Sequence, residues 1–322
     1  MNRKVFLNLA WIFGTGLIVL LVIKIGPTQI WLNIRSISLR NFLFLFILRF
    51  FYWLLRTFYW KAILYRFETG LSFFNLFQAR MAGHAISYLT PSAHLGGEAI
   101  RTLMVNCRNR RMCLASVILD KTIEILTVVF FTVIGLSIAL IRISIPPNMK
   151  IFLIGAVVIV CLFIIFLIHK QKKGLLIWLI DLIGKTRFRF KAFEINREKI
   201  EEADFYISEF FTTHRKSLFY SILFYAFIIF FWTAEIHLTL VVMGADVNLI
   251  DSFLIVTLGT IAFFLPFFPA SIGTYEAAYV AVFEILGMQA GTGLALTVIR
   301  RILALFWAGF GLVMIFIKQH RN

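Results

Sequence analysis

Long apolar runs recur along the chain and are separated by short polar stretches. Each run is about as long as the ~20 residues that a helix needs to cross the hydrocarbon core of a bilayer. Lipid offers backbone amides no hydrogen-bond partner, so a spanning segment forms a helix. The pattern predicts an all-α polytopic membrane protein with about six full transmembrane helices. We place these helices near residues 5–25, 41–64, 112–141, 150–169, 217–242 and 294–317.

Composition agrees with this interpretation. Of the 322 residues, 61% are hydrophobic and only 15% are charged, and the mean hydropathy is +0.90. These values lie far outside the range of soluble proteins. A formal net charge of +16 would suggest a nucleic-acid partner in a soluble chain, but no nucleic-acid fold signature accompanies it here. We expect membrane lipids as partners and no nucleic acid, because basic loops favour anionic headgroups.

Lysine and arginine gather before Val5, at Arg108–Arg111, through Lys170–Lys216 and at Lys318–Arg321. Positive loops stay in the cytoplasm, so we expect both termini to be cytoplasmic in a bacterial or archaeal cytoplasmic membrane. The first run is long enough to span and lacks a small-residue cleavage site, which indicates an uncleaved helix. The segment at about 170–216 mixes basic and aromatic residues, which is typical of an amphipathic helix lying on headgroups.

Two regions, about 73–107 and about 250–287, fit this topology only if each leaves the membrane on the side it entered. Proline ends a helix because it lacks an amide donor and clashes with the preceding turn. Pro91, Pro266 and Pro269 lie at the proposed turning points. We predict two re-entrant helical hairpins that open to opposite faces, within a single membrane domain covering residues 1–322.

The two hairpins share a sequence pattern. PSAHLGGEA at Pro91–Ala99 and PASIGTYEA at Pro269–Ala277 have the same spacing from proline to Glu-Ala. Each is followed by a similar stretch on the next span, Ala115–Asp120 in the first copy and Ala295–Arg300 in the second. Opposed topology with matched spacing predicts an inverted repeat, which is common among transporters whose broken helices meet near the bilayer midplane.

Each predicted hairpin tip leads into a half-helix whose free amides and dipole favour an anion. Gly96, Gly97 and Gly273 would let a backbone or a bulky headgroup approach closely. The alternative is that the tips are structural plugs and the glycines are helix-packing contacts.

Twelve charged residues fall within the predicted membrane segments. Left unpaired, they would cost about 30–40 kcal/mol at ~2.5–3.5 kcal/mol each, so they must pair or face water. Asp120 and Glu124 share one helix face, and the matching span carries Arg300 and Arg301, so we expect acidic and basic helices to face each other. The basic residues are Arg49, Arg56, Arg80, Arg101, Lys121, Arg300 and Arg301, and the acidic ones are Glu98, Asp120, Glu124, Glu235 and Glu276.

Seven basic and five acidic residues leave two positive charges over. We expect this surplus to bind a phosphate-bearing headgroup, with Arg101, Arg300 and Arg301 as first choices because the guanidinium fork fits phosphate. Glu98 and Glu276 would either offset a helix dipole or carry a coupling proton. Arg49 and Arg56 could snorkel or pair with Glu235.

Other chemistry has weak support. His84, His94 and Glu98 do not form a recognisable metal motif, so we expect no metal and no cofactor. No nucleophile motif is present, and we expect no catalytic residue. The three cysteines, Cys107, Cys113 and Cys161, have no disulfide or redox spacing and no assigned role. The sequence leaves open whether the chain forms a homo-oligomer.

The paired motifs, Thr90–Arg101 with Ala115–Asp120 and Pro269–Gly287 with Arg300, resemble the flippase-like membrane domain of lysylphosphatidylglycerol synthases and its stand-alone relatives. The resemblance covers essentially the whole chain. It implies movement of a lipid between leaflets, such as an aminoacylated phosphatidylglycerol, a lipid-linked sugar or a polyprenyl carrier. The aminoacyl-transferase domain of full-length synthases is absent from this sequence, so we do not expect synthesis of lysyl-lipid. Ala270 and Ser271 stand where relatives often have glycine, so the resemblance does not imply one particular headgroup.

The leading hypothesis is a lipid translocase for an anionic phospholipid or a polyprenyl-phosphate-linked lipid. A second hypothesis is an intramembrane enzyme acting on a lipid phosphate, with Glu98, Asp120 or Glu276 as general base. A third is a membrane scaffold whose buried charges hold helices together.

Overall fold

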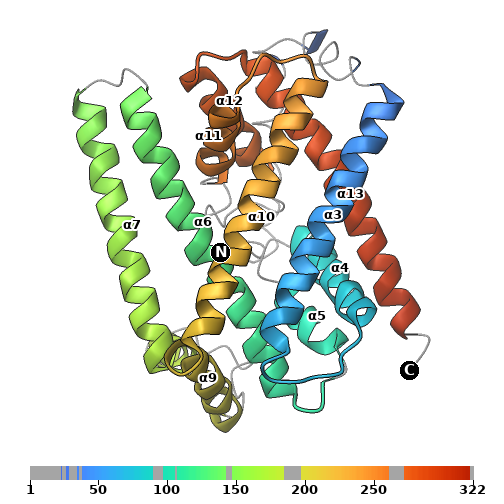
Figure 1. Cartoon of the computed structure of the whole chain (residues 1–322), viewed down its shortest axis with the longest axis vertical. Coiled ribbons are helices and arrows are strands. Elements are labelled where there is room, and N and C mark those ends of the chain that lie inside the picture. The colour runs from blue at the N-terminus through green and yellow to red at the C-terminus, as the bar shows by residue number, and fades with distance from the viewer. Residues whose placement is uncertain are drawn as a thin grey trace.

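The computed structural model describes residues 38–89, 97–105, 107–142, 147–184, 197–260 and 272–319, with a few isolated positions before residue 38. In these ranges the regular structure is helical and no strand occurs. Figure 1 shows the helices as a bundle. They are α3 (Leu39–Leu64), α4 (Phe73–Leu89), α5 (Gly97–Met104), α6 (Arg110–Arg142), α7 (Pro147–Lys173), α8 (Leu175–Gly184), α9 (Arg197–Thr212), α10 (Arg215–Val242), α11 (Leu249–Gly259), α12 (Thr274–Ile285) and α13 (Ala290–Gln319).

Four helices, α3, α6, α10 and α13, are long and apolar enough to cross a membrane. They coincide with four predicted spans, and α7 covers the predicted span at 150–169. The predicted first span, 5–25, lies outside the described residues. Large apolar side chains such as Phe51, Phe227 and Phe316 are exposed on the bundle surface. A lipid-facing surface explains that exposure, so the chain is a polytopic helical membrane protein.

The two predicted hairpin regions contain short helices. The helices α4, α5, α11 and α12 have 17, 8, 11 and 12 residues. All are shorter than the ~20 residues of a full span. In Figure 1, α4 and α5 lie in the lower half of the bundle and α11 and α12 in the upper half. The predicted tips lie outside the described residues, so the arrangement of six spans with two re-entrant hairpins stays a prediction.

Small residues set the contact between α4 and α5. A Cβ placed on Gly97 would collide with the backbone carbonyl of Gly83, so the two backbones touch there. The Gly97 amide donates to Ser87 Oγ at 2.9 Å. This is a helix-packing contact of the kind that the sequence left as the alternative role for the glycines.

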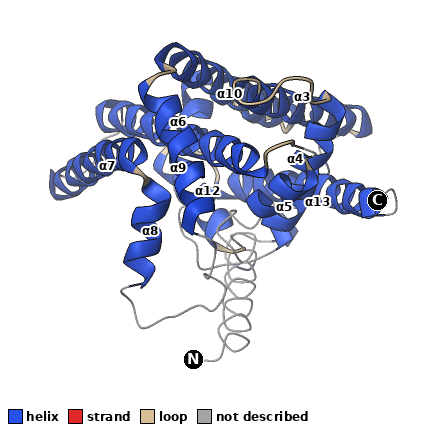
Figure 2. Ribbon diagram, turned by 90° about the horizontal axis from the view of Figure 1, so that it is seen from below, coloured by secondary structure: helices blue, strands red, loops and turns tan. Residues whose placement is uncertain are grey.

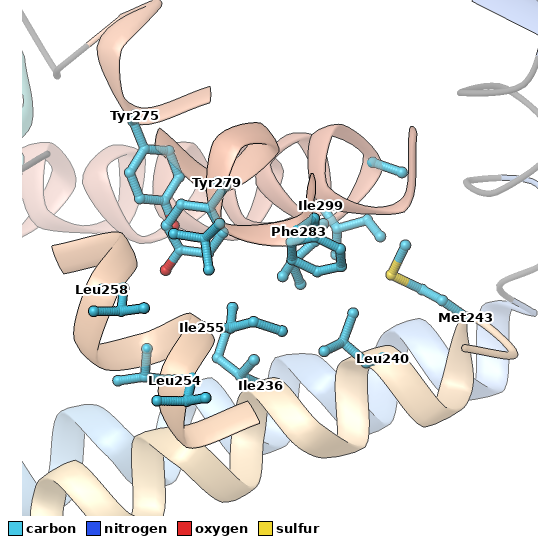
Figure 3. Close-up of a cluster of buried hydrophobic side chains, with 14 of the residues drawn as sticks. Ile236, Leu240, Met243, Leu254, Ile255, Leu258, Tyr275, Tyr279, Phe283 and Ile299 are labelled. Atoms are coloured by element: carbon cyan, nitrogen blue, oxygen red, sulfur yellow. The ribbon is translucent and has the colours of Figure 1, made fainter. Parts of the chain in front are cut away.

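Two large apolar clusters hold the bundle. Figure 3 shows the upper one, in which Tyr279 and Phe283 of α12 pack against Leu254 and Ile255 of α11. The lower cluster joins α3, α6, α9 and α10. Seen from below, α3 and α10 lie next to one another along one side of the bundle (Figure 2).

Within the predicted amphipathic segment, α9 contributes Ile207 and Phe210 to the lower cluster. Its buried face therefore packs on the bundle, while Phe205 of the same helix is exposed. Asp204 of α9 accepts hydrogen bonds from the amides of Leu176 and Ile177 at 3.1 and 2.9 Å, which caps the start of α8. Burial is the largest influence on the pKa of Asp204 and raises it, although these two amides act in the opposite direction.

Candidate functional site

A cavity of about 420 Å³ lies between the helices and is lined mainly by charged and aromatic side chains. Six arginines and one lysine line it, against two carboxylates, Glu98 and Glu124. These cations are the seven basic residues counted at membrane depth in the sequence, so the fold brings all of them to one site. They are Arg49, Arg56, Arg80, Arg101, Lys121, Arg300 and Arg301.

Both copies of the predicted repeat contribute to the cavity wall. Arg101 of α5 represents the first copy, and Thr260 after α11 and Tyr275 of α12 represent the second. The long helices α3, α6, α10 and α13 provide the remaining wall. The predicted hairpin regions therefore meet at one positively charged chamber.

Asp120 is the centre of the most deeply buried charge network. Its side chain is fully buried and accepts hydrogen bonds from Arg80 at 3.1 Å and from Arg101 at 2.7 Å. Arg101 also donates to Glu98 at 2.8 Å. Both guanidinium groups lie over the ring of Trp60, at 5.4 and 4.1 Å from its centroid. Two cations and two carboxylates thus balance one another inside the first copy.

Glu124, one turn further along α6, binds two more cations. Arg56 Nη2 lies 2.6 Å from Glu124 Oε2, and Lys121 Nζ lies 3.4 Å from the same oxygen. Arg56 also donates to the hydroxyl of Tyr225. One carboxylate therefore serves two cations that line the cavity.

Glu276 forms the corresponding network in the second copy. It accepts two hydrogen bonds from Arg301, one of them from Nη2 at 2.9 Å, and one from the amide of Gly273 at 2.8 Å. Gly273 has φ = 82°, a left-handed conformation that favours glycine. Arg301 Nη1 also lies 3.3 Å from the Tyr88 hydroxyl, which ties α13 to the end of α4.

Arg300 differs from the other cations of the cavity. Among the described residues, no carboxylate forms an ion pair with it, and its Nη1 is buried without a hydrogen-bond partner. Its guanidinium lies over the ring of Trp232, 5.3 Å from the centroid. The neighbouring Arg49 is bound by Glu235 at 2.7 Å, which was one of the two roles expected for it.

The structure brings most of the predicted site residues together. Arg101, Arg300, Arg301, Glu98 and Glu124 line the cavity. Asp120 and Glu276 lie behind the wall as partners of lining arginines. Gly97 and Gly273 serve local packing and capping, while Gly96 lies outside the described residues.

One predicted pairing is corrected. The sequence placed Asp120 and Glu124 opposite Arg300 and Arg301, but the two carboxylates bind cations of α3, α4, α5 and their own helix α6. Arg301 binds Glu276 instead. Asp120 and Glu276 are thus neutralised within their own copies, because α5 and α12 each pack directly against the span that follows. Glu124 is bound in part by Arg56 of α3, which lies outside both copies.

Sequence reasoning missed the aromatic part of the wall. Tyr52 lines the cavity beside Arg56, and Trp60 lies beneath Arg101. The spacing of four residues from Tyr52 to Arg56 and from Arg56 to Trp60 places all three on one face of α3, which was a usable signal. Trp232 and Tyr275 gave no such signal, because they lie far from Arg300 in sequence.

Among the described residues, no three His, Cys, Asp or Glu side chains gather in a way that could hold a metal ion. Cys113 is buried in the core formed by α3–α6, and Cys107 packs against that core. In the loop before α6, contact with the Cys113 thiol raises the pKa of Cys107, and burial raises it further.

The family model "Lysylphosphatidylglycerol synthase TM region" matches residues 6–311. A UPF0104 membrane protein of Methanothermobacter thermautotrophicus is 26% identical over 247 residues, covering 72% of this chain and 71% of its own. A UPF0104 membrane protein of Pyrococcus horikoshii is 24% identical over 259 residues, covering 74% of this chain and 75% of its own. The chain therefore belongs to the family of lysylphosphatidylglycerol synthase transmembrane regions.

Proposed function

We propose that this protein is a lipid translocase that moves an anionic, phosphate-bearing lipid between leaflets. The observation that supports this most directly is the cavity at which seven cations meet. Counting the carboxylates that pair with them, Glu98, Asp120, Glu124, Glu235 and Glu276, the cluster has seven positive and five negative charges, a net charge of +2. An anion is needed to neutralise that surplus in a low-dielectric interior.

A phosphate group matches the donors that the cluster offers. Arg300 Nη1 and Arg101 Nη2 are buried and have no partner among the described residues. Guanidinium groups bind phosphate oxygens through charge-assisted hydrogen bonds that are about twice as strong as neutral ones. A headgroup with a net positive charge, such as a lysyl ester, would be repelled by the same cluster.

The proposed route uses the two hairpin regions as opposed gates. The short helices α4 and α5 lie toward one end of the bundle and α11 and α12 toward the other, and both pairs contribute to the cavity wall. Rocking of one copy against the other would then open the cavity to each face in turn. In this proposal, the end of Figure 1 with α9 and the loop before α6 faces the cytoplasm, because their basic clusters favour that side.

Transport requires two compartments, whereas catalysis does not. Purified protein would be reconstituted into sealed vesicles with fluorescent phosphatidic acid, phosphatidylglycerol or polyprenyl phosphate, and the outer leaflet would be bleached chemically. Protein-dependent bleaching beyond the outer-leaflet half supports translocation. Bleaching that stops at the outer leaflet for all three lipids contradicts it.

The same lipids incubated with protein in detergent test the enzymatic alternative. We expect them to be recovered unchanged, because the carboxylates that line the cavity, Glu98 and Glu124, are both held in ion pairs with arginine and are not free to act on a substrate. A new phosphate-containing product in detergent would favour the enzyme hypothesis instead.

A further inference from the structure

Helix α13 contacts α4 and α3 in different ways. Its contact with α4 is close: a Cβ placed on Gly311 would collide with the carbonyl oxygen of Met81 and lie 2.9 Å from the Ala85 side chain. Gln78 Nε2 of α4 lies 3.6 Å from Met314 Sδ of α13. The two backbones touch and pack along much of their length, so α4 and α13 are expected to move together.

The contact between α13 and α3 is made by stacked rings. Trp307 stacks on Phe46 and on Phe50, with centroids 5.1 and 5.9 Å apart and both ring planes within 13° of parallel. Phe306 meets Phe46 edge to face at 4.7 Å. The rings keep these two backbones apart, in contrast to α4 and α13. We call these four residues the aromatic seam.

The aromatic seam connects the cavity with the outer surface of the bundle. Trp307 lines the cavity and is only 4% exposed, and its indole nitrogen is buried without a partner among the described residues. Phe50 and Phe306 are 37% and 54% exposed. On this helical bundle that outer surface faces lipid. One layer of side chains therefore separates the charged cavity from the hydrocarbon region.

We propose that the aromatic seam is a lateral portal that binds the hydrocarbon chain of the transported lipid while its phosphate lies in the cavity. This inference rests on the proposed function. A long hydrocarbon chain gains nothing from a cavity lined by arginines and must stay in an apolar medium. Unstacking of Phe46, Phe50 and Trp307 requires side-chain rotation and a small shift of α3 away from α13 and from α4, which α3 contacts through side chains such as the Phe50–Phe77 ring pair. Opening between α4 and α13 would instead require two touching backbones to part.

A cross-link across the aromatic seam tests the portal. The three native cysteines, Cys107, Cys113 and Cys161, would first be replaced by serine. Phe46→Cys and Phe306→Cys would then be joined by a short bis-methanethiosulfonate reagent, which a reductant removes. We expect the rate of translocation of the fluorescent phosphate lipid to fall to near that of protein-free vesicles, because gating motions of this kind limit turnover, and to return after reduction.

The matched control joins Gln78→Cys and Met314→Cys in the same background with the same reagent. These residues are in contact across the close α4–α13 interface, so the cross-link holds together helices that already move as one. We expect transport to be unchanged. Equal transport with and without the seam cross-link would overturn the portal, since a joined seam cannot pass a lipid chain.

A second measurement tests the portal independently of whether the protein translocates lipid. The protein in vesicles would be irradiated with phosphatidic acid or polyprenyl monophosphate that has a diazirine in its hydrocarbon chain, with and without an excess of the unlabelled lipid. Labelling of peptides containing Phe46, Phe50 or Trp307 that the excess lipid removes supports the portal. Competed labelling confined to other helices overturns it, even if translocation is normal, while wild-type protein that does not translocate lipid contradicts the proposed function.

Discussion

The two copies of the predicted repeat differ in chemistry at matching positions of the shared sequence pattern. Ten residues after the motif proline stand Arg101 in the first copy and Tyr279 in the second. Each lies against a glycine of the preceding helix, Gly83 for Arg101 and Gly259 for Tyr279. A glycine of the preceding helix thus makes room for an arginine side chain in one copy and for an aromatic ring in the other.

The charges of the two copies differ in the same way. The position of Asp120 in the first copy is occupied by Arg300 in the second, since both stand five residues after the matching alanine. In the first copy Asp120 neutralises Arg80 and Arg101, whereas Arg300 has no ion-pair partner among the described residues. The comparison shows that Arg80 and Arg101 of the first copy are balanced by carboxylates, whereas Arg300 of the second copy is a cation available to bind an anion.

The largest expected effect comes from removing the carboxylate that balances the buried arginines of the first copy. Asp120→Asn leaves two buried guanidinium groups without their shared carboxylate, and breaking a buried ion pair costs about 3–5 kcal/mol. We expect a marked fall in the thermal unfolding temperature in detergent and in the amount of protein in the membrane. The control is Asp251→Asn, which removes the partly exposed partner of Arg142 and should cost less than about 1 kcal/mol. Equal losses in the two variants would show that Asp120 is not the centre of a buried network.

The next effect tests why the first hairpin needs glycine where the second has tyrosine. Gly97 stands at the position of Tyr275, and any side chain there meets the backbone of Gly83. Gly97→Ala should lower the free energy of unfolding by about 1–3 kcal/mol through overpacking. Gly309→Ala, at a helix position with open space around it, should be neutral or stabilising by up to ~1 kcal/mol. Thermal unfolding of both variants measures the difference. Equal stability of Gly97→Ala and Gly309→Ala would refute the close α4–α5 contact.

Removing the free cation of the second copy should affect binding rather than stability. Arg300→Gln deletes one charge-assisted hydrogen bond, worth about 1.5–3 kcal/mol, so affinity for polyprenyl monophosphate should fall by roughly tenfold or more. Unfolding temperature should hardly change, because no carboxylate loses a partner. Arg300→Lys, which keeps the charge without the fork, should lie between wild type and Arg300→Gln. Unchanged affinity in Arg300→Gln, measured by fluorescence anisotropy in detergent, would mean that the anion binds elsewhere.

The smallest effect concerns a residue outside both copies. Burial raises the pKa of Asp204 above that of the unfolded chain, so the folded state holds the proton more tightly. Its contribution to stability is present below the unfolded pKa and is lost as pH rises through the folded pKa. In the wild type, this group lowers the unfolding temperature as pH rises through the mildly acidic range. Asp204→Asn should therefore make that decline with rising pH less steep. A steeper decline in the variant would contradict this, and lipid binding should be the same in both proteins.

Much of the architecture could be predicted from sequence because bilayer thickness leaves few choices for an apolar run. The helices α3, α6, α10 and α13 lie where hydropathy placed spans, and the count of buried charges anticipated that they must pair. The partners could not be predicted, since helix spacing says which residues share a face but not which face a neighbouring helix presents. The pairing of Asp120 with Arg80, 40 positions away, depends on how α5 packs between α4 and α6, and no local pattern encodes that.

The central claim is that a lipid phosphate is held among the arginines of the cavity, and its most direct test is a distance. In vesicles containing ¹⁵N-arginine-labelled protein and polyprenyl monophosphate, solid-state NMR would detect ³¹P–¹⁵N dipolar coupling between phosphate and guanidinium groups. We predict short contacts, consistent with N···O distances of about 2.7–2.9 Å, that weaken in Arg300→Gln. The same coupling in wild type and variant, or none in either, would contradict the account.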